Sequence, residues 1–138
     1  ELEPLGISPS ALEVVLRGMD AVVNTPGGTA YNTARIDEPG MTIAGKTGTS
    51  QVRRITAAER VTGVKKNEDL PWHMRDHALF VAFGPTDSPR YAIAVLVEHG
   101  GGGSRFAAPI AKDVMRLVLE RDPSRARPIV SKDSNDAA

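Results

Sequence analysis

The chain has 138 residues, no cysteine, and 17 basic against 17 acidic residues, so its formal net charge is zero. This length suits one domain, and the lack of cysteine excludes a disulfide framework, a thiolate metal site and a cysteine nucleophile. Balanced charge disfavours a dedicated nucleic-acid-binding protein, and apolar runs such as residues 92–97 are too short to span a membrane.

A helix is the first predicted element. Ser8 offers a capping hydroxyl before Pro9, which suits the first helical position, and residues 10–13 also fit a capping box. The turn-forming run 24–28 ends the helix. Its apolar stripe has helical spacing and consists of Leu12, Val15, Leu16, Met19, Val22 and Val23.

Little regular structure is predicted for residues 25–76. Residues 25–40 predict a loop or a short second helical piece, and residues 41–45 predict a strand with residues 46–49 at or near its end. Residues 53–76 mix basic and acidic side chains without a sustained period. A connection this long is usually functional or mobile, so we expect 53–76 to be an exposed loop between two strands.

Two strands, residues 77–83 and 91–98, give the clearest pattern in the chain. Alternate residues are apolar on both faces of each strand, which is typical of strands in a sheet covered on both sides. The linker 84–89 is rich in turn-forming residues, so the two strands predict a hairpin.

A final helix is predicted from near Pro109 to Pro123, with the stripe Ile110, Val114, Leu117, Val118 and Arg121. Residues 123–138 are polar and predict a disordered tail. The order of elements predicts an α/β (α+β) fold in which an antiparallel sheet is sandwiched between helices. Three strands are few for such a sheet, so we expect this chain to form only part of a domain.

The sharpest motif is Gly45-Lys46-Thr47-Gly48-Thr49-Ser50-Gln51. Lys-Thr-Gly on a strand occurs in penicillin-binding proteins and class A β-lactamases. An ammonium group beside a serine nucleophile lowers the cost of developing negative charge, and Gly48 leaves a stretch of strand bare for a substrate backbone. The Thr49 hydroxyl can hold a carboxylate, and its N–H can help to hold an oxyanion.

Over residues 5–120 the chain resembles class B penicillin-binding proteins, specifically the elongation-type penicillin-binding protein 2. Four stretches carry the resemblance: Gly45 to Val52, Arg75 to Phe80, Phe83-Gly84-Pro85 with Pro89 to Val95, and Glu98 to Gly103. The resemblance implies a penicillin-binding transpeptidase or serine β-lactamase-like fold, of which residues 1–122 would be the C-terminal portion.

The resemblance also implies two motifs that this sequence lacks. None of the eight serines has lysine three positions later or asparagine two positions later, so Ser-x-x-Lys and Ser-x-Asn are both absent. In the family both precede Lys-Thr-Gly. We therefore expect the nucleophile to lie in the N-terminal part of the same protein and this chain alone to be inactive.

By resemblance, the complete protein is a peptidoglycan D,D-transpeptidase that cross-links stem peptides ending in D-Ala-D-Ala and is acylated by β-lactams. Lys46 and Thr49 would be catalytic, and Thr47, Gly48, Thr49 and Ser50 would bind substrate. No metal or organic cofactor is implied. His73 and His77 have a helical ligand spacing but lead into a strand, where their side chains do not converge.

The resemblance further implies a bacterial inner-membrane protein with a periplasmic catalytic domain, acting in cell elongation with a SEDS-family glycosyltransferase and other elongation-complex proteins. Three alternatives stay open: a septal class B transpeptidase, a serine β-lactamase or D,D-carboxypeptidase, and a non-catalytic module that binds β-lactams or muropeptides.

Overall fold

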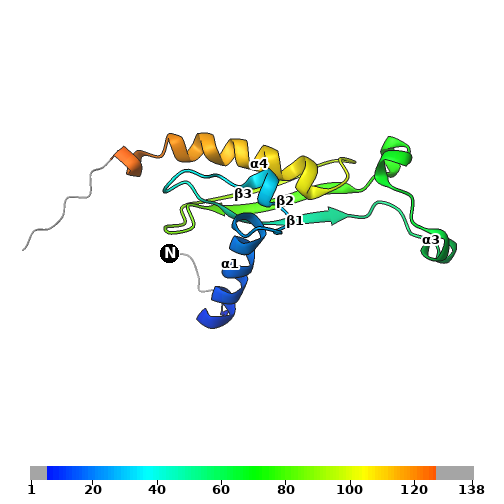
Figure 1. Ribbon diagram of the computed structural model, residues 1–138, viewed down its shortest axis with the longest axis horizontal. Helices are drawn as coiled ribbons and strands as arrows, with labels where there is room; N and C mark the ends of the chain where they lie inside the picture. Colours follow the sequence, from blue (N-terminus) through cyan, green and yellow to red (C-terminus); the bar gives the residue numbers. More distant parts are fainter. Residues whose placement is uncertain (1–5, 127–138) are drawn as a thin grey trace, which may run out of the picture.

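The computed structural model describes residues 6–126, without the side chains of residues 125 and 126. This part of the chain contains three strands, four α-helices and three short 3₁₀ turns (Figure 1). In chain order the helices and strands are α1 Pro9–Asn24, α2 Tyr31–Ala34, β1 Ala44–Ser50, α3 Ala57–Thr62, β2 His77–Gly84, β3 Tyr91–Val97 and α4 Gly103–Glu120.

The three strands form one antiparallel sheet in the order β1-β2-β3. Helix α4 runs along one face of this sheet (Figure 1). Ala78, Phe80 and Ala82 of the central strand point to that face and are buried. The predicted hairpin 77–83 and 91–98 is confirmed as β2 and β3, and so is the predicted mixed fold with an antiparallel sheet packed against helices.

The core lies between α4 and the sheet because α4 presents small side chains there. Ala107, Ala108 and Ala111 are fully buried, so the helix axis comes close to β2. At Gly103, a Cβ atom would overlap the carbonyl oxygens of both Gly48 and Leu79, so only glycine fits. The largest fully buried side chains are Phe80, Ile43, Met115, Leu119 and Val23.

The start of the last helix is six residues earlier than the sequence predicts. Pro109 fits the first position of a helix, but it lies inside α4, which begins at Gly103. A proline in a helix interior removes one hydrogen bond, and burial of the small residues around it outweighs that loss. The predicted apolar stripe is also wrong, because Ile110, Val114 and Leu117 are exposed.

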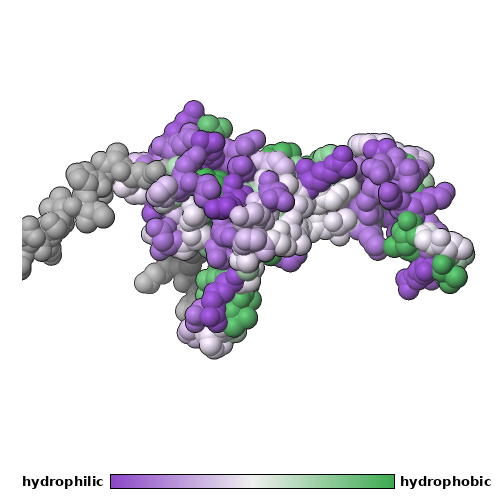
Figure 2. Space-filling model, in the orientation of Figure 1, coloured by the Kyte–Doolittle hydropathy of each residue, from purple (hydrophilic) through white to green (hydrophobic). Residues whose placement is uncertain are grey.

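The first helix begins as predicted, and the Ser8 hydroxyl accepts a hydrogen bond from the Ala11 N–H at 3.3 Å. The capping box at residues 10–13 is wrong, since Ser8 caps the helix and Ser10 already lies in its first turn. Only Val23 of the predicted stripe is buried. The N-terminal half of α1 projects from the body (Figure 1), and Figure 2 shows hydrophobic side chains on it.

The face of the sheet opposite α4 is covered only in part by the described residues. Near this face, Met19 of α1 lies beside Val81 and Phe83. Val81 is 44% exposed and Leu96 is 58% exposed. The sequence pattern is therefore apolar on both faces, whereas the described chain covers one face fully.

The motif strand lies further along the chain than predicted. Residues 41–45 were expected to form it, but β1 spans Ala44–Ser50, so the whole Lys-Thr-Gly motif is inside the strand. Its position is fixed by pairing with β2, in which Ala44 faces Phe83 and Ser50 faces His77. Met41 and Ile43 are buried in the core ahead of the strand.

Residues 53–76 connect β1 with β2 and extend to one end of the molecule (Figure 1). They contain α3, in which Thr56 and Glu59 form a capping box, and two 3₁₀ turns at Asn67–Asp69 and Trp72–Met74. None of the residues of α3 is buried. Of the expected tail 123–138, residues 123–126 form a 3₁₀ turn, and residues 127–138 lie outside the described part. Within residues 6–126, no helix has the length and apolar character needed to cross a membrane.

Candidate functional site

The five residues predicted as a site all lie on β1, which in the described chain pairs only with β2 and is an edge strand. Neighbouring residues of a strand point to opposite faces. Thr47 and Thr49 face the α4 side, because their β2 partners, Phe80 and Ala78, are buried beneath α4. The structure therefore gathers the motif on one strand and divides its side chains between two faces.

Lys46 lies on the opposite face, across from the half-exposed Val81. Gly48 and Ser50 share this face with it. The Lys46 Nζ donates a hydrogen bond to the Thr47 carbonyl oxygen at 2.7 Å. Among the ion pairs of the described residues, none involves Lys46. Its ammonium group is thus a positive charge beside the apolar, half-exposed Val81.

Four hydroxyl groups, which we call the hydroxyl cluster, connect Thr47 to the body of the protein. The Thr47 and Thr29 hydroxyls lie 3.1 Å apart. The Ser104 hydroxyl donates to the Thr29 carbonyl oxygen at 2.5 Å and lies 3.3 Å from the Thr33 hydroxyl. The cluster therefore joins β1, α2 and the first turn of α4.

The sequence prediction did not find Thr29, Thr33 or Ser104. Ser104 is 75 positions from Thr29, so only the fold brings them together. Threonine and serine are too common for their presence near a motif to mark a site. The one local signal is that Ser104 directly follows the stretch Glu98 to Gly103, which is rich in glycine.

Asp76 fixes the C-terminal end of β1 against the segment 53–76. Its carboxylate accepts from the Val52 N–H at 3.4 Å and from the Asn67 side-chain amide at 3.2 Å. Its own N–H donates to the Asn67 side-chain oxygen at 2.8 Å. The Asp76 carbonyl accepts from the Gly101 N–H at 2.8 Å, which ties the segment to the glycine-rich loop before α4.

The loop after β3 is held by two histidines. His99 has a positive φ of 52°, and its N–H donates to His77 Nδ1 at 2.9 Å. The His99 Nδ1 lies 2.9 Å from the Arg75 carbonyl oxygen, and the Trp72 ring packs on the His99 ring with centroids 4.5 Å apart. His77 therefore has a structural role at the start of β2. Within residues 6–126, no group of three metal-ligating side chains forms.

Two carboxyl groups have lowered pKa values, and both lie away from the motif. The Ser124 N–H and hydroxyl, followed by Arg90, lower the pKa of Asp122. Thr56 and then Arg53 lower the pKa of Glu59 through hydrogen bonds. Both carboxylates hold structure together, Asp122 at the end of α4 and Glu59 at the start of α3.

The described chain thus combines an edge strand that carries Lys-Thr-Gly-Thr with the β2–β3 hairpin and helix α4. The model of the penicillin-binding protein transpeptidase domain matches residues 1–116, and the chain belongs to this family.

Among its relatives, the chain is similar to peptidoglycan D,D-transpeptidase MrdA of Haemophilus influenzae, with 37% identity over 114 residues, which is 81% of this chain and 16% of the relative.

Two solved structures show the same similarity. Penicillin-binding protein 2 of Helicobacter pylori, in complex with MreC, superimposes with a TM-score of 0.64 and 34% identity over 80% of this chain and 17% of that one. Pseudomonas aeruginosa PBP2, in complex with WCK 5153, superimposes with a TM-score of 0.59 and 35% identity over 88% of this chain and 23% of that one. The chain thus spans about a sixth to a quarter of the length of these proteins.

Proposed function

We propose that this chain supplies the Lys-Thr-Gly strand of an elongation-type peptidoglycan D,D-transpeptidase, and that a segment outside the chain supplies the serine nucleophile. The observation that carries the proposal is the position of Lys46 on the incompletely covered apolar face of the sheet. A segment that packed on this face would bring its own side chains directly to the Lys46 ammonium group.

The geometry of β1 supports a substrate-binding role for the other motif residues. An edge strand can pair its main chain with an extended peptide, and the exposed Thr49 and Ser50 stand at its end. Gly48 leaves the strand without a side chain where a peptide backbone would approach. Thr47 is held by the hydroxyl cluster, which fixes its rotamer for contact with a carboxylate.

The proposed chemistry is acyl transfer. The serine oxygen attacks the penultimate D-Ala carbonyl carbon, the peptide C–N bond breaks, and D-Ala leaves with a proton. An amine from a second stem peptide then takes the acyl group and frees the serine. Lys46 would stabilise the developing negative charge on the serine, and the Thr49 N–H would donate to the carbonyl oxygen as it becomes an oxyanion.

The wider setting of the proposal follows the relatives. The names of the similar proteins support elongation over septal synthesis. An elongation enzyme would face the periplasm from the bacterial inner membrane, and would act beside a SEDS-family glycosyltransferase and a partner of the MreC kind. β-Lactams would acylate it as mimics of D-Ala-D-Ala.

Intact-mass spectrometry after incubation with a penicillin tests the proposal. The samples are the chain alone, the chain joined to the segment encoded upstream of it, and the joined protein with Lys46→Ala. We expect one adduct, located on the upstream segment of the joined protein. The rate of its formation should fall at least a hundredfold in Lys46→Ala, given the size of electrostatic contributions in such sites.

Two results would contradict the proposal. An adduct on the chain alone would place the nucleophile among its own eight serines. A folded joined protein that binds penicillin without an adduct would favour the non-catalytic binding module. Lys112→Ala on α4 is the matched control, because it removes a lysine away from the motif strand and should leave acylation unchanged.

A further inference from the structure

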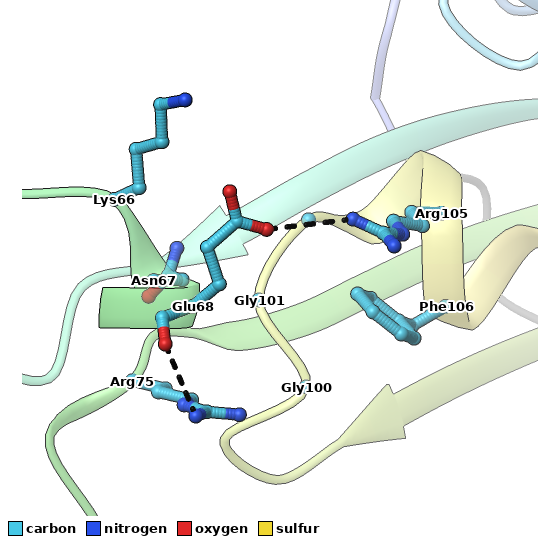
Figure 3. Close-up of a pocket in the computed structure, with 9 residues that line it drawn as sticks. Lys66, Asn67, Glu68, Arg75, Gly100, Gly101, Arg105 and Phe106 are labelled. Carbon is cyan, nitrogen blue, oxygen red and sulfur yellow. Dashed lines mark hydrogen bonds and ion pairs between the residues drawn. The ribbon is translucent and has the colours of Figure 1, made fainter. Parts of the chain in front are cut away.

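A cavity lies between the base of the segment 53–76 and the first turn of α4 (Figure 3). Its volume is about 240 Å³. This is smaller than the sites that enclose drug-sized ligands, and it suits one charged group with a short apolar part. We call it the basic pocket, defined by Lys66, Glu68, Arg75, Arg105, Phe106 and the Gly100–Gly101 main chain.

Three cationic side chains, two from the segment 53–76 and one from α4, line the basic pocket, against a single carboxylate. Arg75 precedes β2, Arg105 belongs to α4, and Lys66 stands at the rim with its ammonium group directed outward (Figure 3). Arg75 of the segment 53–76 and Arg105 of α4 both line the pocket, and this pair favours an anionic ligand, because Arg presents a planar fork that matches a carboxylate.

The single carboxylate in the basic pocket is weakly held. Glu68 reaches toward Arg105 across Gly101 (Figure 3), with an N–O distance of 3.9 Å. Both side chains are mostly exposed, 64% and 75% respectively, and an exposed pair of this length contributes little. A ligand carboxylate with better geometry would therefore displace Glu68 from Arg105.

Arg75 is positioned more firmly than Arg105. Its Nε donates to the Leu70 carbonyl oxygen at 3.0 Å and one Nη donates to the Glu68 carbonyl oxygen at 3.4 Å. These bonds fix the guanidinium group without neutralising its charge. The Phe106 ring, with the Arg105 guanidinium 5.2 Å from its centroid, adds an apolar wall.

The basic pocket adjoins the motif strand through glycine contacts. Gly101 donates to the Asp76 carbonyl oxygen, and Gly103 packs directly on Gly48. Thr47 and Thr49 face the α4 side of the sheet, and the first turn of α4, which packs on Gly48, lines the pocket through Arg105 and Phe106. A peptide held along β1 at Thr49 would therefore continue toward the basic pocket.

We infer that the basic pocket binds a carboxylate side chain of an acidic peptide, namely the peptidoglycan stem peptide positioned along β1. This inference rests on the proposed function for the identity of the peptide. It adds a second recognition point, distant from the reacting carbonyl, which would select stem peptides by their free acidic side chains.

Calorimetric titration tests the inference on the joined protein and on the 138-residue chain alone. The probes are the acidic tripeptide alanyl-γ-glutamyl-diaminopimelate, the same tripeptide with its carboxylates amidated, and inorganic phosphate. We expect the acidic tripeptide to bind at least tenfold more tightly than the amidated one and than phosphate. Arg105→Gln should weaken it three- to tenfold, which is the range for a charge-assisted bond near solvent, and Lys66→Gln should weaken it less, because the Lys66 ammonium group is directed outward.

Two further variants sharpen the test. Glu68→Gln removes the competing carboxylate and should tighten the acidic tripeptide. Arg60→Gln on exposed α3 removes an arginine that does not line the basic pocket and should change nothing. Equal binding of the acidic and amidated tripeptides, equal binding of phosphate, or no binding in either preparation would overturn the inference.

Penicillin acylation separates this inference from the proposed function. Acylation at the wild-type rate without tripeptide binding would refute the basic pocket alone. Tripeptide binding that responds to Arg105→Gln in a joined protein that penicillin never acylates would refute the transpeptidase proposal and leave a carboxylate-binding pocket.

Discussion

Replacing Gly103 with alanine should push α4 away from the motif strand. The added Cβ would overlap the carbonyl oxygens of Gly48 and Leu79, which are main-chain atoms and cannot rotate aside. Overpacking of this kind destabilises a protein by about 1–3 kcal/mol. The gain in helix propensity from glycine to alanine is at most about 1 kcal/mol in a helix interior and smaller at a first position, so the net effect is a loss.

The neighbouring Gly102→Ala is the matched control. No atom lies within 4 Å of a Cβ built at Gly102, and its φ of −81° suits any residue. Urea unfolding of the joined protein should show a lowered midpoint for Gly103→Ala and a change within about 0.5 kcal/mol for Gly102→Ala. Equal effects of the two variants would refute the close approach of α4 to Gly48.

Two further predictions concern stability. Phe80→Ala empties a fully buried site between β2 and α4 and should lower the free energy of unfolding by about 3–5 kcal/mol. Phe106→Ala, at a residue that is 41% exposed, should lower it by less than half as much. The pKa of Asp122 is lowered by Ser124 and then by Arg90, so its contribution is complete above the unfolded-state pKa of about 3.9 and is lost as the pH falls through the lowered native value. The free energy of unfolding of Asp122→Asn should accordingly fall less steeply with decreasing pH in that range than that of the unchanged protein. The same pH dependence in both proteins would contradict this reasoning.

The hairpin could be predicted from the sequence because its residues are apolar on both faces and its linker is rich in turn formers. Those signals are local, and pairing with β1 only reinforces them. The start of α1 could also be predicted, since Ser8 and Pro9 act on the residues that directly follow them.

The start of α4 could not be predicted, because it depends on contacts far along the chain. Pro109 is a strong local signal for a first helical position, yet Gly103 and Ala107 extend the helix backwards by packing on the sheet. The extent of β1 was missed for a related reason. The glycine-containing motif has low strand propensity, and only the ladder with β2 holds it extended.

The candidate site was predictable in its motif and not in its surroundings. Lys46 and Thr49 could be predicted because they belong to a short contiguous sequence motif. Thr29 and Ser104 become neighbours of Thr47 only when α2 and α4 pack beside β1. The same holds for the basic pocket, where only the fold brings Arg105 of α4 beside Lys66 and Arg75 of the segment 53–76.

The partly uncovered sheet face and the Lys46 ammonium group both indicate that a further segment packs on this side of the sheet. The sheet lacks full cover on the face of Val81 and Leu96, and Lys46 projects from that face without an ion-pair partner among the described residues. A covering segment would exclude water and lower the local dielectric, which strengthens every charge interaction there. An ammonium group enclosed in this way is costly unless negative charge lies beside it. In the proposed reaction that charge arises on the attacking serine oxygen, so the cover that completes the fold would also make Lys46 an effective electrostatic catalyst.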